Sequence, residues 1–335
     1  MTTSDIIKKL IIAFKNKNED DFYKLTSEYI ELEEKKNHRV LASEIKEIIS
    51  KGNFNNNGKG THYKSIIPIP RDSEKGFPLL EIKKYDNFWE QLIIKDDTLE
   101  SLKNIENEFN QREILYTYNL KYKNKILFCG QPGTGKTFTA QILSTELHLP
   151  LIYVRFDSIV SSYLGETATN LRKVFDYISN DIFIVLFDEF DIIGKNRDDH
   201  YEHGEIKRVV NNFLQMIDNF SGESIIIAST NHQHILDPAL WRRFDDVIYF
   251  DLPDKELRLK QIELFLKPIK KEKINFDFYV NKTEGLSPSD IKLMCIEAMK
   301  YSILNNSKEL TNQDLKHSLK KIMNRKKIKL GNFKK

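Results

Sequence analysis

The chain has 335 residues, with 52 Lys and Arg against 49 Asp and Glu, so its formal net charge is +3. Apolar residues make up 40% of the sequence and only 13 residues are Gly, which excludes a collagen-like or wholly disordered chain. No apolar run reaches the roughly 20 residues of a membrane-spanning helix. The first residues lack the apolar core of a signal peptide, and two cysteines cannot build a disulfide framework. We therefore expect a cytoplasmic protein with no membrane span.

The positive charge collects at the C-terminus. Residues 320–335 hold 8 Lys and Arg and no acid, so the rest of the chain has a net charge of −5. Two interpretations stay open for this segment. It is either a solvated chain end or a contact for nucleic acid or an acidic partner.

The first 51 residues carry apolar side chains at helical spacing in three stretches, near residues 6–14, 22–30 and 40–49. This spacing predicts an N-terminal helical module over residues 1–51. Residues 52–64 are rich in Gly and Asn, which predicts a linker.

Residues 65–252 alternate between short apolar runs and helical patterns. The predicted strands are Lys125–Cys129, Leu151–Phe156, Ile182–Phe187, Ser224–Ser229 and Asp246–Phe250. Near-continuous apolar strands separated by helices are typical of a parallel sheet that is covered on both faces. The sequence therefore predicts an α/β fold with a parallel five-stranded sheet.

After Pro253 the pattern is helical only, which predicts an all-α subdomain over residues 253–320 and a basic tail over residues 321–335. Ser287 is a candidate N-cap and Pro288 suits the first turn of the helix that follows.

Residues 130–137 match the Walker A pattern at every defining position. They are Gly130, Gln131, Pro132, Gly133, Thr134, Gly135, Lys136 and Thr137. Glycines let successive backbone N–H groups point at phosphates, and the following helix offers its positive N-terminal end. Lys136 is expected to reach the terminal phosphates, and the Thr137 hydroxyl is expected to bind Mg²⁺.

A buried strand ends in two acids, Asp188 and Glu189. Ligands of open α/β sheets bind beyond the carboxyl ends of the strands, so both acids should face the nucleotide. Asp188 is expected to bind Mg²⁺ and Glu189 to activate the attacking water. Alone, such a pair is more often the start of a loop, but it follows a Walker A motif and so predicts a Walker B motif.

Together these residues resemble the AAA group of the AAA+ ATPases, over roughly residues 65–320. The resemblance rests on the order Asp188-Glu189, on Asn231 after the fourth predicted strand, and on residues 236–245 (LDPALWRRFD). It implies ATP and Mg²⁺ as ligands, a homo-oligomer that is usually a hexameric ring, and a P-loop NTPase fold followed by a helical lid.

The same resemblance makes Asn231 the sensor-1 residue, and Arg242 and Arg243 arginine fingers that act on a neighbouring subunit. Many members of the group separate these arginines, whereas here they are adjacent, so which one acts as the main finger stays open. A surface ion pair is the alternative interpretation. The lid motif lacks the sensor-2 arginine of other AAA+ branches, which again resembles the AAA group.

Tyr163, Leu164 and Gly165 resemble the aromatic–aliphatic–Gly triplet of pore loop 1 in rings that thread proteins. A tyrosine offers a large apolar surface that can grip an extended polypeptide. The alternative is that Tyr163 is a packing residue at the start of a helix.

Two functions follow as expectations. The first is ATP-driven remodelling, unfolding or threading of a protein substrate through a ring. The second is a nucleic-acid-dependent ATPase or a regulatory ATPase that controls a partner enzyme. Compact bacterial members of the group sometimes work with a separately encoded subtilisin-like protease, and no protease motif occurs in this sequence. The net charge of the body makes nucleic acid the less favoured partner.

Overall fold

The computed structural model describes residues 6, 8–10, 19–35, 68–72, 76–155, 159, 164–190, 203–232, 241–307 and 309–329. The chain divides into two compact units, Met1–Lys64 and Ser65–Lys335. In the first unit, α2 (Glu19–Lys35) covers the second predicted helical stretch, and Ile30 on it is buried. The third stretch, residues 40–49, lies outside the described residues.

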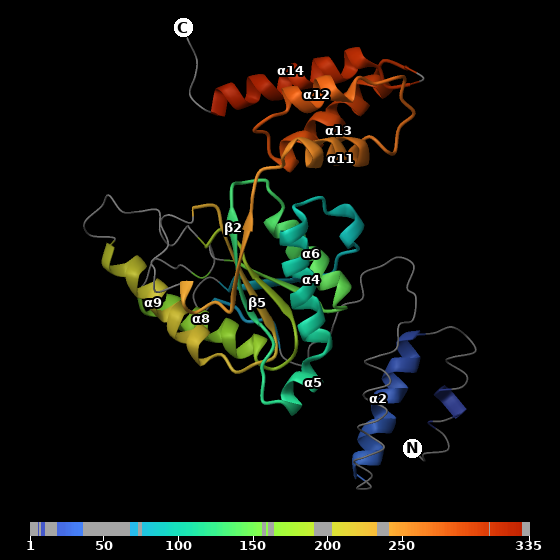
Figure 1. The fold of residues 1–335 in the computed structure, drawn as a ribbon. Helices are drawn as coiled ribbons and strands as arrows, with labels where there is room; N and C mark the ends of the chain where they lie inside the picture. The colour runs from blue at the N-terminus through green and yellow to red at the C-terminus, as the bar shows by residue number, and fades with distance from the viewer. Residues whose placement is uncertain are drawn as a thin grey trace. The chain divides into compact units, whose positions relative to one another are not determined.

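A sheet of six strands forms the centre of the α/β part of the second unit, in the order β1-β3-β4-β5-β2-β6 (Figure 1). The strands are β1 (Leu80–Lys83), β2 (Lys125–Gly130), β3 (Leu151–Val154), β4 (Ile184–Phe187), β5 (Ile225–Thr230) and β6 (Asp246–Phe250). Strands β2 to β6 are parallel and coincide with the five predicted runs, which confirms the α/β fold.

The sheet has one strand more than the five predicted, because β1 adds an antiparallel edge. Leu80 lies opposite Val154, and Lys83 lies opposite Leu151. The strand has only four residues, two of them charged, and hydrophobic periodicity cannot distinguish so short a segment from a loop.

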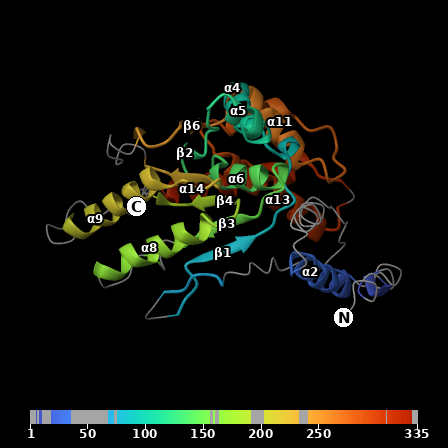
Figure 2. The same cartoon turned by 90° about the horizontal axis from the view of Figure 1, so that it is seen from below.

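Helices cover both faces of the sheet (Figure 2). One face packs against α4 (Asp96–Asn110) and α6 (Lys136–Glu146), and the other against α8 (Leu164–Ile178) and α9 (His203–Asn219). Successive strand residues alternate between the faces, because side chains in a strand have a period of two. Ile184 and Leu186 join the core under α4 and α6, whereas Val185 and Phe187 join the core under α8 and α9. Because both faces of the sheet are buried, nearly every residue of these strands is apolar, which explains the continuous apolar runs in the sequence. The short segments η1 (Trp89–Gln91) and α5 (Arg112–Thr117) flank α4.

A helical subdomain, the lid, follows the sheet and has its own apolar core. It contains α11 (Lys255–Phe265), α12 (Phe276–Lys282), α13 (Pro288–Leu304) and α14 (Asn312–Lys329). Ser287 caps α13 as predicted: its side chain accepts from the Asp290 backbone N–H, in a capping box, with Pro288 in the first turn. Among the helices that the structure describes, none is long and apolar enough to cross a membrane.

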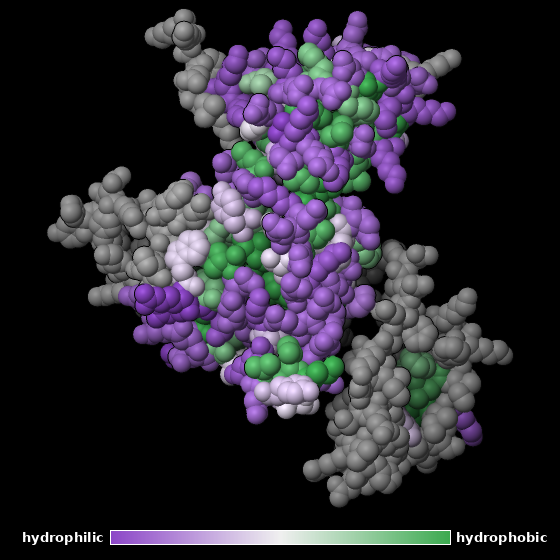
Figure 3. Space-filling model, viewed as in Figure 1, coloured by the Kyte–Doolittle hydropathy of each residue, from purple (hydrophilic) through white to green (hydrophobic). Residues whose placement is uncertain are grey.

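The last lid helix extends into the segment predicted as a basic tail. α14 runs through residue 320 to Lys329, and Ile322 is only 3% exposed within the lid core. Lys321 forms an ion pair with Glu297, and the Lys326 ammonium donates to the Gly285 carbonyl at 2.7 Å. Hydrophilic side chains cover most of the visible lid surface (Figure 3). Residues 321–329 are therefore part of the lid, because one apolar face of a charged helix is enough to anchor it.

We predict that Ile322→Ala lowers the free energy of unfolding by about 2–5 kcal/mol, because it leaves a cavity in the lid core. Ile328→Ala is the matched control, since Ile328 on the same helix is 57% exposed and should cost about 0.5 kcal/mol or less. Urea unfolding monitored by circular dichroism measures both. Equal effects would place residues 321–329 outside the lid core.

Candidate functional site

The glycine-rich loop connects β2 to α6 at the carboxyl edge of the sheet. Three of its glycines have positive φ: 147° at Gly130, 79° at Gly133 and 112° at Gly135. L-residues with side chains rarely adopt these angles, so the path of the loop requires glycine at these positions. The predicted Walker A residues thus form one strand–loop–helix unit.

Lys136 begins α6 and is only 5% exposed. Its ammonium group donates to the carbonyl oxygens of Gly130, at 2.7 Å, and Gln131, at 3.0 Å, and to the side-chain oxygen of Asn231, at 2.8 Å. The positive charge therefore lies within the curve of the loop, beside the N-terminal end of a helix, where anions are stabilised.

The strand order explains why Asn231 reaches Lys136. β5 lies between β2 and β4, so the residue that follows β5 stands between the loop after β2 and the acids after β4. This arrangement brings together residues that are 95 positions apart in the sequence.

Asp188 follows β4 and completes the same edge. Its Oδ2 accepts a hydrogen bond from the Thr137 hydroxyl at 2.7 Å and a longer one from the Tyr153 hydroxyl at 3.4 Å. Burial, followed by the charge of Asp188, raises the pKa of Tyr153, so its hydroxyl stays protonated and can donate. Sequence reasoning missed Tyr153 because nothing local in β3 marks it. Only the pairing of β3 with β4 places it there.

Glu189, the second acid of the pair, has an exposed side chain and a positive φ of 52°. A glutamate in this region is uncommon, and such strain is concentrated at functional sites. Its backbone N–H donates to Asp188 Oδ1 at 3.0 Å, so the strained turn also orients the Asp188 carboxylate.

The two arginines lie between β5 and β6. Arg243 Nε donates to Asp218 Oδ2 of α9 at 2.8 Å, in an ion pair within the chain, and Arg242 is exposed. The ion pair that the sequence left open thus exists for Arg243, and the finger role of both arginines stays a prediction.

The predicted pore residues are only partly covered by the structure. Tyr163 lies outside the described residues, whereas Leu164 and Gly165 are the first two residues of α8.

The lid contacts the glycine-rich loop directly. The Ser289 backbone N–H, at the start of α13, donates to the Gly133 carbonyl at 3.1 Å. A Cβ atom on Gly133 would lie 2.9 Å from both Ser287 Oγ and Ser289 Cβ. Gly133 is therefore required for close contact as well as for its φ, and a rotation of the lid would act on the loop.

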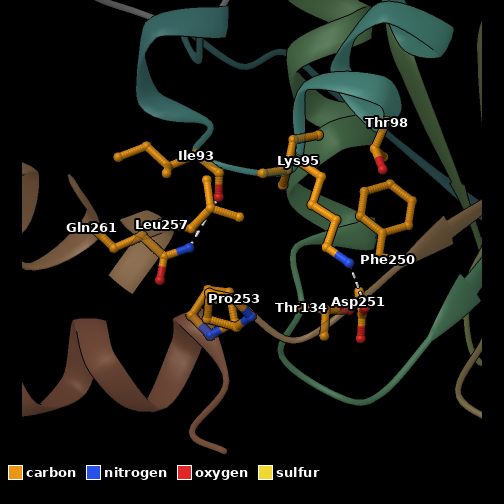
Figure 4. A pocket seen from close by; sticks show the side chains of 11 residues that line it. Ile93, Lys95, Thr98, Thr134, Phe250, Asp251, Pro253, Leu257 and Gln261 are labelled. Atoms are coloured by element: carbon orange, nitrogen blue, oxygen red, sulfur yellow. Dashed lines mark hydrogen bonds and ion pairs between the residues drawn. The ribbon is translucent and has the colours of Figure 1, made fainter. Parts of the chain in front are cut away.

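A pocket opens next to this contact, between the segment before α4 and the lid helix α11 (Figure 4). It is partly open to solvent and is lined by residues of the α/β part and of the lid. Thr134 of the loop lines it, so the loop and the pocket form one continuous site.

We predict that Gly130→Ala destabilises the protein by about 3 kcal/mol or more, because its φ of 147° suits glycine only and an added Cβ would overlap the Phe250 carbonyl of β6. Gly76→Ala is the control: its φ is also positive, but nothing lies within 4 Å of the added Cβ, so it should cost about 1–2 kcal/mol. Denaturant unfolding compares the two variants, and a smaller loss for Gly130→Ala than for Gly76→Ala would contradict the close approach of β2 and β6.

Comparison with known proteins agrees with this geometry. A model of the family described as "ATPase family associated with various cellular activities (AAA)" matches residues 126–252, which contain the glycine-rich loop, both acids, Asn231 and both arginines.

Three relatives extend the match. An AAA family ATPase described as uncharacterized, y4kL of Sinorhizobium fredii, is 35% identical over 95% of this chain and 95% of its own length. A putative 26S proteasome regulatory subunit homolog from Methanocaldococcus jannaschii is 36% identical over 59% of this chain and 55% of its own. A proteasome-activating nucleotidase from Saccharolobus solfataricus is 35% identical over 63% of this chain and 56% of its own. With the relative that matches almost end to end, and with the site geometry above, the chain belongs to the AAA family of ATPases and is an ATP-hydrolysing enzyme.

Proposed function

We propose that this ATPase uses ATP hydrolysis to unfold or remodel protein substrates, as a ring-shaped homo-hexamer. The observation that carries the proposal is the hydrogen-bonded network at the carboxyl edge of the sheet, in which Lys136, Asn231, Thr137 and Asp188 are joined by two contacts of 2.8 and 2.7 Å. These residue types, brought together at one edge of the sheet, suit binding of a triphosphate and cleavage of its terminal phosphoanhydride bond.

In this proposal the loop from Gly130 to Thr137 holds the phosphates of ATP through its backbone N–H groups. Lys136 turns from the loop carbonyls to the terminal phosphates, and Asn231 holds its ammonium group in place. Thr137 and Asp188 hold Mg²⁺, since both offer the oxygen ligands that this ion prefers. The ion, when bound, neutralises charge on the phosphates.

Glu189 accepts a proton from the attacking water. A carboxylate in that role contributes about 10²–10⁴-fold to a rate. The strained backbone at Glu189 supports this assignment, because it fixes the direction of the side chain relative to Asp188.

Arg242 and Arg243 act on ATP bound to a neighbouring subunit. A planar guanidinium suits the charge that builds on a transferring phosphoryl group. The ion pair of Arg243 with Asp218 would orient the pair at the subunit surface, with the exposed Arg242 beside it.

Tyr163 grips the substrate, followed by Leu164 and Gly165 at the start of α8. Protein is the favoured substrate because two relatives have names that refer to the proteasome. By the same argument a separately encoded protease is a candidate partner. The alternative, a nucleic-acid-dependent ATPase, would use the basic side chains of α14, of which Lys321 and Lys326 already have partners within the lid.

We predict that Tyr163→Ala retains ATP hydrolysis but loses unfolding activity, because the alanine removes the gripping surface and leaves the ATPase site intact. The assay measures ATP-dependent loss of fluorescence from a folded fluorescent protein with an unstructured extension, with phosphate release measured in parallel. Tyr163→Phe, which keeps the aromatic surface, should retain both activities.

Glu189→Gln serves as the second control, since it should bind ATP and lose hydrolysis and unfolding together. Unchanged unfolding by Tyr163→Ala would rule out the gripping role. Stimulation of hydrolysis by DNA or RNA, without unfolding by the wild-type protein, would favour the alternative.

A further inference from the structure

The pocket between the segment before α4 and α11 has mostly apolar walls. Ile94, Phe250, Pro253 and Leu257 line it, and Thr134 marks the side where it joins the phosphate-binding loop. Flat apolar walls next to a phosphate site suit a heterocyclic base whose phosphates lie on the loop.

One polar side chain on this wall is almost completely buried. Gln261 of α11 is 2% exposed, and its Nε2 donates to the Ile93 carbonyl at 2.9 Å, across the boundary between the lid and the α/β part (Figure 4). Because Ile93 offers only a carbonyl oxygen there, the amide must present its nitrogen to Ile93. Its oxygen is thereby left for another partner.

The Gln261 Oε1 atom has no hydrogen-bond partner among the residues that the structure describes. A buried acceptor without a partner costs about 1–3 kcal/mol. Since the residue lines the pocket, a donor group on a ligand can remove this cost. Two other side chains that line the pocket already have partners: Asp251 accepts from the Lys95 ammonium at 2.7 Å, and the Thr134 hydroxyl donates to the Gln131 carbonyl at 2.8 Å.

We propose that Gln261 selects the base of the nucleotide, by accepting a hydrogen bond at Oε1 from the exocyclic amino group of adenine. Guanine carries a carbonyl oxygen at the equivalent ring position. This oxygen and Gln261 Oε1 are both acceptors, so they would repel each other instead of forming a hydrogen bond. Rotating the amide to offer Nε2 to guanine would break the bond to Ile93. The side chain thus couples base identity to the contact between lid and α/β part. This inference rests on ATP binding by a single subunit and does not depend on the ring or on a protein substrate.

The test compares ATP with purine riboside triphosphate, which lacks only the exocyclic amino group. Dissociation constants are measured by calorimetry, so no hydrolysis is needed. The wild-type protein should bind ATP about tenfold or more tightly than the analogue, because a site that hydrogen-bonds a donor rejects a ligand lacking it. In Gln261→Met, which keeps the length of the side chain without the amide, the ratio should fall to about 1, with little change for the analogue.

Glu263→Leu is the control on the exposed face of the same helix and should keep the wild-type ratio. Equal binding of both ligands by the wild-type protein would overturn the proposal, and this result does not depend on the variant folding. A wild-type ratio that persists in Gln261→Met would overturn it too, since another group would then read the amino group. Failure of the wild-type protein to bind either ligand would instead contradict the ATPase site itself.

Discussion

The order of the strands in the sheet determines which residues meet at the site. The hydrogen bond between Lys136 and Asn231 depends on this order, and so does the position of Asp188. Parallel strands bring their carboxyl ends to one edge, and the position of β5 between β2 and β4 puts Asn231 between the glycine-rich loop and Asp188. The loop holds its shape because glycines adopt positive φ at three positions, and because Gly130 leaves no side chain against β6. A site built this way is supported by two buried cores, one on each face of the sheet.

The lid extends this site, and two of its described residues form hydrogen bonds with the α/β part beside the pocket. Ser289 donates to Gly133 of the loop, and Gln261 donates to Ile93 before α4. The pocket is lined by Ile94 and Thr134 of the α/β part and by Leu257 and Pro288 of the lid, so a ligand bound there would contact both parts. An ATPase that converts nucleotide state into movement needs contacts of this kind, because a lid can respond only through groups that interact differently with each state. The N-cap at Ser287 fixes where α13 begins and hence where Ser289 meets the loop.

Much of the fold and site could be predicted from sequence, for identifiable physical reasons. Local spacing marks the loop from Gly130 to Thr137, and continuous apolar runs mark the five parallel strands. Strand β1 was not predicted, because four residues are too few to show the alternation of apolar and polar side chains that marks a strand. The roles of Tyr153 and Gln261 were not predicted either. Their partners, Asp188 and Ile93, are distant in the sequence, and only the fold brings them together. The many basic residues after residue 320 predicted a tail, although α14 continues to Lys329. One buried face, which includes Ile322, is enough to anchor a basic helix in the lid.

The central claim is that the lysine at the edge of the sheet binds the phosphates of ATP, and titration of ATP into Lys136→Ala tests it most directly. Removing a buried, charged partner of the phosphates should raise the dissociation constant about a hundredfold or more. The matched control is Lys260→Ala, which removes an exposed lysine that pairs with Glu256 outside the pocket and should leave binding within about threefold of wild type. Lys136→Ala leaves three oxygen acceptors without this donor and should lower the denaturant midpoint, so binding is measured without denaturant on protein that circular dichroism shows to be folded. Wild-type affinity in a folded Lys136→Ala protein would contradict the account.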